Sequence, residues 1–166
     1  MTASSEPTDC VIAGDGTTET TTNIDAGAPV ISRQEIDIAA PLQVVLDLHT
    51  DVAAWPSWNP DISNVVLERP LAAGSSFRWS SGGLDIRSTV YALTERARIL
   101  WGGTVQGIVG IHQWIFIETA SGTHVATRES FNGEPVEANP AALQDALDAS
   151  LVSWLGYLKS SAEANT

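Results

Sequence analysis

The sequence predicts an α+β fold in which a curved antiparallel sheet of about seven strands wraps around one long C-terminal helix. Three observations support this fold: a strand pattern followed by short helical segments, a run of six short strand patterns, and a long apolar stripe with helical spacing at the end of the chain. A sheet with one apolar face needs a cover, and the final helix carries the matching stripe. A straight helix held by a curved sheet leaves a hollow between them.

Residues 30–38 (VISRQEIDI) alternate between apolar and polar side chains, as in a half-buried strand. The next segment, APLQVVLDLH, has Pro41 at a plausible first helical position and apolar residues at helical spacing. One more helical turn fits before Pro56 and Pro60, which cannot continue it. Two short helices are therefore expected after the first strand.

The middle of the chain predicts a meander of short strands, because segments rich in β-branched and aromatic residues alternate with Gly, Ser and Pro. The expected strands are ISNVVLERP, SSFRWSS, LDIRSTVYALTE, ARILWGG, VGIHQWIFIET and THVATRESF. Gly107 and Gly110 interrupt an apolar stretch and indicate a bulge or a bend there.

The final helix has a strong start signal, with Asn139 at the N-cap and Pro140 at the first helical position. Its apolar stripe is about four turns long. The stripe consists of Leu143, Leu147, Leu151, Trp154, Leu155 and Leu158.

The domain organisation is expected to be simple. Residues 1–28 are rich in Thr, Ser, Gly and acidic residues and have no apolar period, so they are interpreted as a disordered N-terminal tail. Residues 29–163 form a single domain, and no internal repeat or second boundary follows.

The net charge of −12 opposes binding to nucleic acid and to anionic membrane surfaces. Cys10 is the only cysteine, and nothing has the Cys and His spacing of a zinc site, so neither a disulfide nor a metal or other cofactor is expected. No signal-peptide pattern or long apolar run is present, and a cytoplasmic location is the default expectation. The sequence leaves open whether the protein is a monomer or a homodimer.

The order of elements, together with WPSWNP, PLAAGSSFRW, ILWGG, GIHQW and the closing RESFNG, resembles the polyketide cyclase and dehydrase-like branch of the START (SRPBCC, helix-grip) superfamily. The resemblance covers residues 30–160. It implies a deep apolar cavity between the sheet and the long helix that binds a hydrophobic, polyketide-like small molecule. Members include aromatase/cyclases, ligand carriers, proteins that sequester toxic metabolites and chaperone-linked modules, so the fold does not determine the function.

The last two strands predict the most specific candidate site. If Ser121 and Gly122 form the turn of their hairpin, His112 and Glu129 become diagonal neighbours on the inner face, with Cα atoms roughly 7 to 8 Å apart. A buried Glu next to a His suits acid–base catalysis of enolisation or dehydration. The alternatives are a polar pair that satisfies itself, or a pair that orients a ligand.

Other side chains are candidates for lining the cavity. Ser88 could offer a hydroxyl to a ligand or bond to nearby backbone. Trp58 and Asn59 are expected at the cavity rim, with Trp55 in the core, whereas His49 is expected to be packed or half-exposed on the first helix. The remaining candidates are aromatic residues on the inner face, which could equally be core: Trp79, Trp101, Trp114, Phe116 and Phe131.

Three functional hypotheses follow. The first is an enzyme of the polyketide cyclase/aromatase or dehydratase type, in which His112 and Glu129 move protons. The second is a non-catalytic protein that carries a hydrophobic molecule or sequesters it for self-resistance. The third is a protein-interaction module like the chaperone-linked relatives.

Overall fold

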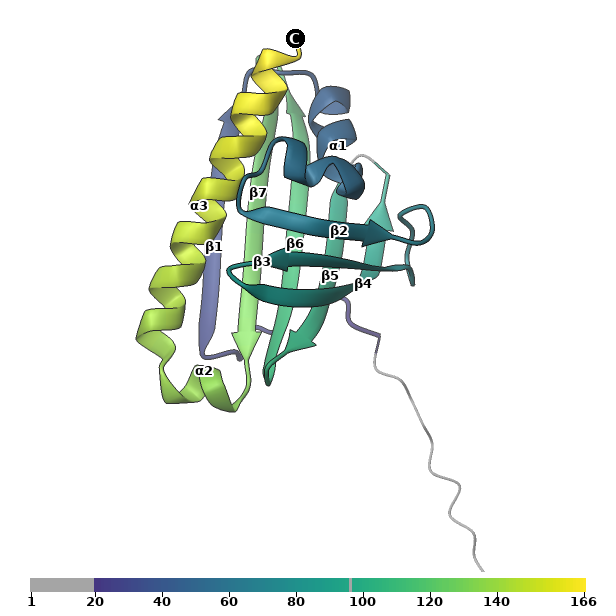
Figure 1. Ribbon diagram of the computed structural model, residues 1–166. Coiled ribbons are helices and arrows are strands. Elements are labelled where there is room, and N and C mark those ends of the chain that lie inside the picture. Colours follow the sequence, from purple (N-terminus) through teal and green to yellow (C-terminus); the bar gives the residue numbers. More distant parts are fainter. Residues whose placement is uncertain (1–19, 96) are drawn as a thin grey trace, which may run out of the picture.

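The sheet consists of seven strands. They are β1 (Val30–Ile38), β2 (Ile62–Leu67), β3 (Ser76–Ser81), β4 (Leu84–Thr94), β5 (Arg98–Val105), β6 (Ile108–Thr119) and β7 (Gly122–Asn132). All neighbouring strands are antiparallel, in the order β1-β7-β6-β5-β4-β3-β2. In this computed structural model, which describes residues 20–95 and 97–166, β2, β3 and β4 curl across the front of the longer strands (Figure 1). The predicted α+β fold with a curved antiparallel sheet is confirmed.

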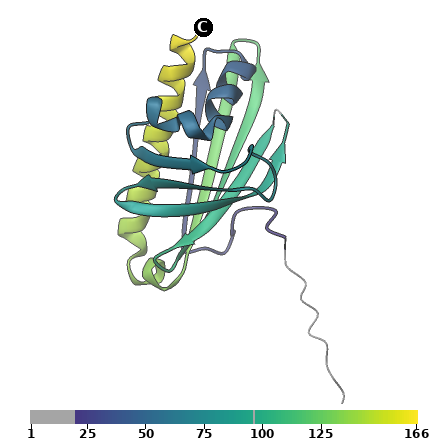
Figure 2. The same ribbon diagram turned by 45° about the vertical axis from the view of Figure 1, so that its right-hand side comes forward.

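Four helical segments accompany the sheet: α1 (Leu42–Thr50), the 3-10 helix η1 (Val52–Ser57), α2 (Glu134–Ala138) and α3 (Pro140–Ala164). The long helix α3 packs along β1, and α1 with η1 lies near its C-terminal end (Figures 1 and 2). The five-residue α2, which the sequence analysis did not anticipate, lies at the opposite end (Figure 1). No helix in the described part of the chain is long and apolar enough to cross a membrane.

The final helix begins where the sequence predicts, with Asn139 at the N-cap and Pro140 at the first helical position. Its apolar stripe faces the sheet, and the stripe residues from Leu147 to Leu158 are buried. Burial of these side chains on one face, and not intrinsic helix propensity alone, therefore holds the helix against the sheet.

The β6–β7 hairpin differs from its predicted register by two residues. Thr119 pairs with Gly122, so the turn consists of Ala120 and Ser121 and not of Ser121 and Gly122. Gly122 is the first residue of β7, and glycine is required there because a Cβ atom would overlap the carbonyl oxygen of Ile38. A two-residue shift leaves every side chain on its predicted face, whereas a one-residue shift would have reversed them.

Gly107 and Gly110 have different roles from the one predicted. Gly107 lies in the β5–β6 turn with a φ of +81°. Gly110 lies within β6, where pairing with both neighbouring strands is continuous, so the expected bulge is wrong. The register shifts occur instead between β2 and β3 and between β4 and β5, in the part of the sheet that curls.

Residues 20–28, within the segment expected as a tail, lie against the outer face of the sheet. Ile24 is buried, the amide of Asp25 donates to Ser130 Oγ, and Asn132 Nδ2 donates to Asp25 Oδ2. We call this segment the N-terminal strap. Residues 1–19 of the expected tail lie outside the described residues.

The apolar core is divided into two clusters. The larger one gathers α1, η1, the C-terminal half of α3 and the aromatic residues of the sheet. The smaller one joins Val30, Val136, Leu147 and Leu151 at the other end of the molecule. The hollow that contains the candidate site is lined by members of both clusters.

Candidate ligand-binding and acid–base site

A cavity of about 310 Å³ lies between the inner face of the sheet and the N-terminal half of α3. Three of the six tryptophans, Trp79, Trp101 and Trp154, line it at one end. Phe131 and Leu147 line it farther along, the β3–β4 turn contributes Gly82, and the end of β5 contributes Val105. Pockets of this size and apolar character are typical of sites for small hydrophobic molecules.

His112 and Glu129 form a polar pair on the wall of this cavity. They lie directly opposite each other on β6 and β7, and His112 Nδ1 is 3.4 Å from Glu129 Oε2. The predicted diagonal relationship is thereby corrected, because the shifted turn moves Glu129 two residues along its partner strand. The His112 side chain is only 2% exposed, and that of Glu129 is 17% exposed. Both residues line the cavity, so a ligand would meet them.

A chain of hydrogen bonds determines which nitrogen of His112 carries the proton. Thr127 Oγ1 donates to the backbone carbonyl of Gln113 at 3.2 Å, so its single proton is already used. With that proton directed to Gln113, the same oxygen, 2.7 Å from His112 Nε2, accepts a hydrogen bond there. Neutral His112 is therefore protonated on Nε2, and the lone pair on Nδ1 points toward Glu129.

Burial favours the neutral form of both groups. It raises the pKa of Glu129 from 4.5 to about 8. It also lowers the pKa of His112 well below 6.5, and the nearby His49 lowers it further. Near neutral pH the pair is thus a carboxylic acid beside a neutral imidazole, and not an ion pair.

Ser88 and Trp79 form a second polar contact on the cavity wall. Trp79 Nε1 donates to Ser88 Oγ at 3.0 Å. Both residues line the cavity, and Ser88 is buried. Among the described residues, no group accepts a hydrogen bond from the Ser88 hydroxyl. The hydroxyl can therefore rotate and donate to a ligand.

Two predicted aromatic candidates, Trp114 and Phe116, share the inner face but do not line the cavity. The ring of His49 covers them, with centroid distances of 4.5 Å to Trp114 and 5.1 Å to Phe116. Both belong to the larger core cluster. The end of the sheet that α1 covers is therefore packed, and the hollow is confined to the other end.

The WPSWNP motif also lies away from the cavity. Trp55 is fully buried, as predicted, and its Nε1 donates to the carbonyl oxygen of His49 at 2.9 Å. Asn59 is buried, and its side chain accepts from the amide of Asp61 at 3.0 Å. Trp58 lies in a shallow depression beside α1 and Asn165. The expected rim position of Trp58 and Asn59 is thus corrected, because η1 turns this loop against α1.

His49 is the most unusual side chain of the core. It is completely buried among Trp55, Trp101, Trp114 and Phe116, and neither ring nitrogen has a hydrogen-bond partner within the described residues. Burial lowers its pKa from 6.5 to about 3. His49 was expected to be packed or half-exposed on the first helix, and it is packed. Its aromatic neighbours come from η1, β5 and β6, so the pattern of its own helix could not predict them.

The cavity-lining residues that sequence reasoning missed include residues of α3, glycines of the sheet, and the strand residues Leu84, Ile86 and Ile108. The helical stripe identified Leu147 and Trp154 as apolar but not as cavity walls. Gly103 and Gly110 pair with each other and both line the cavity. A glycine has no side chain, so the apolar and polar pattern of the sequence cannot assign it to the inner face. Its position in the cavity wall follows only from the strand pairing.

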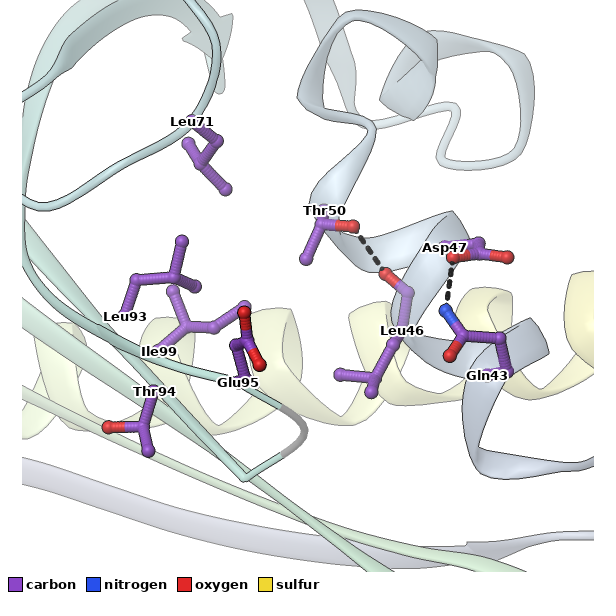
Figure 3. Close-up of a pocket in the computed structure, with 9 residues that line it drawn as sticks. All are labelled: Gln43, Leu46, Asp47, Thr50, Leu71, Leu93, Thr94, Glu95 and Ile99. Atoms are coloured by element: carbon purple, nitrogen blue, oxygen red, sulfur yellow. Dashed lines mark hydrogen bonds between the residues drawn. The ribbon is translucent and has the colours of Figure 1, made fainter.

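A second depression, of about 430 Å³, lies between α1 and the β4–β5 turn (Figure 3). Its polar side chains mostly bond to their own helix: Gln43 Nε2 donates to Asp47 Oδ1, and Thr50 Oγ1 donates to the carbonyl of Leu46. Asp47 and Glu95 are exposed. The depression is larger than the cavity, but it lacks a buried acid–base pair.

The sequence matches the family model described as polyketide cyclase / dehydrase and lipid transport over residues 29–163. No curated protein is a significant sequence match. The family resemblance drawn from the sequence is therefore confirmed by the family model.

Solved structures share the fold at low sequence identity. A hypothetical protein from Helicobacter pylori is 17% identical with a TM-score of 0.72, covering 86% of this chain and 98% of that one. A START superfamily protein from Mycobacterium smegmatis is 15% identical with a TM-score of 0.70, covering 82% and 99%. The di-domain ARO/CYC protein StfQ from the steffimycin biosynthetic pathway is 17% identical with a TM-score of 0.68, covering 82% of this chain and 51% of that one.

This chain belongs to the polyketide cyclase / dehydrase and lipid transport family, and its fold is that of the START superfamily.

Proposed function

We propose that the protein binds a hydrophobic, polyketide-like small molecule in the cavity between the sheet and α3, and that His112 and Glu129 catalyse its enolisation. The observation that carries this proposal is the position of a carboxyl group and an imidazole 3.4 Å apart on the wall of a largely apolar cavity of about 310 Å³. Similarity to ARO/CYC structures from biosynthetic pathways supports the ligand class.

The two carboxyl oxygens of Glu129 have separate tasks in this proposal. Oε2 faces His112 Nδ1 and carries the proton, because Nδ1 holds a lone pair. Oε1 lies toward Gly110, a cavity-lining residue, so it is the oxygen that meets a ligand. The distance of 3.4 Å between Oε2 and Nδ1 is long for a hydrogen bond, as is common for catalytic pairs without substrate.

Enolisation then proceeds by a double proton transfer. The carbon next to a ligand carbonyl gives its proton to Oε1, and the bonding electrons form the enolate. The Oε2 proton moves to Nδ1, so the carboxyl group stays neutral and His112 becomes an imidazolium. In a dehydration, the reverse transfer delivers a proton to the leaving hydroxyl group, which departs as water. The charges that form are the imidazolium and the enolate, which have opposite sign and lie on either side of the neutral carboxyl group.

The cavity would hold the ligand in a reactive arrangement. Trp101 and Trp154 approach the His112 ring edge to face, with centroid distances of 5.3 and 5.5 Å. These rings restrict where a flat ligand can lie relative to the pair. The Ser88 hydroxyl is suited to orient a ligand carbonyl.

Non-catalytic binding for transport or sequestration is the second candidate. Only 17% of the Glu129 side chain is exposed, and its nearest polar partner is His112. Two buried polar groups that pair with each other can be purely structural and need no reaction to explain them. A protein-interaction module has less support. A docking surface usually exposes several large apolar side chains in one patch. In the described part of the chain, the large exposed apolar side chains are spread over β2, β6 and α3: Val66, Val109, Ile117 and Val152.

A naphthyl-substituted β-diketone tests the proposal. Its enol form, prepared in ethanol, is diluted into buffer, and the loss of enol absorbance is followed by stopped flow with and without protein. We expect the wild type to accelerate ketonisation, and His112→Ala and Glu129→Gln to remove most of the acceleration. Glu118→Gln, at an exposed glutamate of the same hairpin, is the matched control. Binding of the diketone without any acceleration by the wild type would support the carrier instead.

A further inference from the structure

Gly110 occupies a position at which neither the backbone nor the packing requires glycine. It lies in a regular stretch of β6, paired with Gly103 on one side and with Phe131 on the other. Its φ is not in the left-handed region that favours glycine. A Cβ atom there would lie 3.4 Å from Phe131 Cε1 and 3.5 Å from Glu129 Oε1, which are ordinary contacts. The chain would therefore tolerate alanine, and the missing side chain leaves space within the cavity.

The space above Gly110 borders one particular oxygen. Glu129 directs Oε2 toward His112 and presents Oε1 to the place that a Gly110 side chain would fill. Oε2 lies 3.4 Å from His112 Nδ1, so a neutral Glu129 whose proton faces the imidazole carries it on Oε2. Oε1 therefore faces the cavity with free lone pairs, and it can accept a hydrogen bond but not donate one.

We propose that Gly110 and Glu129 Oε1 form a subsite for the hydroxyl group of an enolic or phenolic ligand, and that Gly110 determines specificity by leaving room for that group. The inference rests on the proposed binding function and names the ligand class for the same cavity. The Phe131 ring borders the subsite, with Cε1 3.4 Å from the Gly110 Cβ position, and Trp101 and Trp154 line the same cavity. A flat ring system bearing a hydroxyl at its edge satisfies both the apolar walls and the lone acceptor.

The subsite should reject a ligand that lacks the hydroxyl proton. Such a ligand would cover Oε1 without replacing its hydrogen bond, and a buried polar group left unpaired discriminates strongly between close analogues. We expect roughly tenfold to hundredfold weaker binding for the analogue. A methyl ether carries the same ring and oxygen but no donor, so it is the appropriate comparison.

The test compares β-naphthol with its methyl ether by isothermal titration calorimetry. Wild-type protein should bind β-naphthol at least about tenfold more tightly than the ether. Gly110→Ala should weaken β-naphthol binding by a similar factor, because the added methyl group occupies the space of the hydroxyl. Gly156→Ala is the matched control, since a Cβ atom at this α3 position has no atom within 4 Å. Equal affinity of the wild type for both probes, or unchanged β-naphthol binding in Gly110→Ala, would overturn the inference.

Glu129→Gln separates this inference from the proposed catalysis. The amide can donate from nitrogen to His112 Nδ1 and keep its carbonyl oxygen toward Gly110, which reproduces the hydrogen-bond pattern of the neutral acid. The variant should therefore retain the preference for β-naphthol while losing the acceleration of diketone ketonisation. Acceleration of ketonisation by the wild type without any preference for β-naphthol over its methyl ether would refute the subsite alone. A preference for β-naphthol without acceleration by the wild type would refute only the enzymatic proposal.

Discussion

Glu129 and His112 face each other across β7 and β6, with Oε2 3.4 Å from Nδ1, yet burial shifts their pKa values in the directions opposite to those of an ion pair. Thr127 favours a proton on His112 Nε2, because its own hydroxyl is within hydrogen-bond distance of the Gln113 carbonyl. The pair is consequently a donor and an acceptor in a defined order, which can be tested through stability, spectroscopy and turnover.

The first prediction concerns stability at alkaline pH. The pKa of Glu129 is raised from 4.5 to about 8, so the folded protein holds this proton more tightly than the unfolded chain does. The resulting stabilisation is complete below about pH 4.5 and is lost as the pH rises to about 8. Between these limits the free energy of unfolding of the wild type should fall by several kcal/mol relative to Glu129→Gln, since one pKa unit corresponds to about 1.4 kcal/mol.

Urea unfolding of both proteins across this pH range measures the difference. Glu118→Gln should follow the wild type, because Glu118 is exposed. Parallel pH profiles for the wild type and Glu129→Gln would show that Glu129 is ionised in the folded state.

The second prediction concerns His49, whose buried ring has no hydrogen-bond partner among the described residues. Its pKa is lowered from 6.5 to about 3, so stability is complete above about pH 6.5 and is lost as the pH falls toward 3. His49→Phe should be at least as stable as the wild type at neutral pH, because it removes an unpaired polar group. Below about pH 6 the variant should be the more stable of the two.

Thermal melting at neutral and acidic pH checks this expectation. His49→Leu is a second variant for the same test, because the Phe ring is larger than imidazole and can overpack the site. The half-buried, ion-paired His124 provides the control His124→Gln, which should keep the acid sensitivity due to His49. A His49→Phe protein that is less stable than the wild type at acidic pH would refute the assignment.

The third prediction concerns Thr127 as a positioning residue. Thr127→Val removes the acceptor of His112 Nε2, so the neutral imidazole can carry its proton on Nδ1 instead. Diketone turnover should fall roughly tenfold or more, and Thr127→Ser should restore it. Nitrogen NMR of His112 reports the tautomer directly. An unchanged tautomer in Thr127→Val would contradict the proposed order of protons even if turnover fell.

The fourth prediction concerns the N-terminal strap. Ile24 is 8% exposed against the outer face, and Asp25 bonds to Ser130 and Asn132. Ile24→Ala should lower the free energy of unfolding by about 2 kcal/mol. Ile117→Ala, at a 52% exposed isoleucine, should change it by less than about 0.5 kcal/mol. Urea denaturation distinguishes the two, and equal small effects would mean that the strap adds little stability.

The elements of the fold were predictable because their signals are local. The alternation of residues 30–38 matches β1, and the Asn139–Pro140 pair marks the start of α3. The α2 segment was missed because five residues are too few to show a helical period. The β6–β7 turn was misplaced because glycine is common in turns, and Gly122 was assigned to the turn for that reason. In the structure, glycine is required at this position because the carbonyl oxygen of Ile38 leaves no room for a Cβ atom.

By itself the sequence predicted the fold class and placed His112 and Glu129 on the inner face of neighbouring strands, since both follow from side-chain periodicity. The tertiary structure set the register that places the two residues directly opposite each other and not diagonally. Only the tertiary structure decided which inner-face residues border the cavity and which are packed. His49 reaches Trp114 from α1 and fills one end of the sheet, while α3 closes the other end over Gly110 and Glu129 without filling it. Periodicity assigns a face to each side chain, but the space above that face depends on elements distant in the chain.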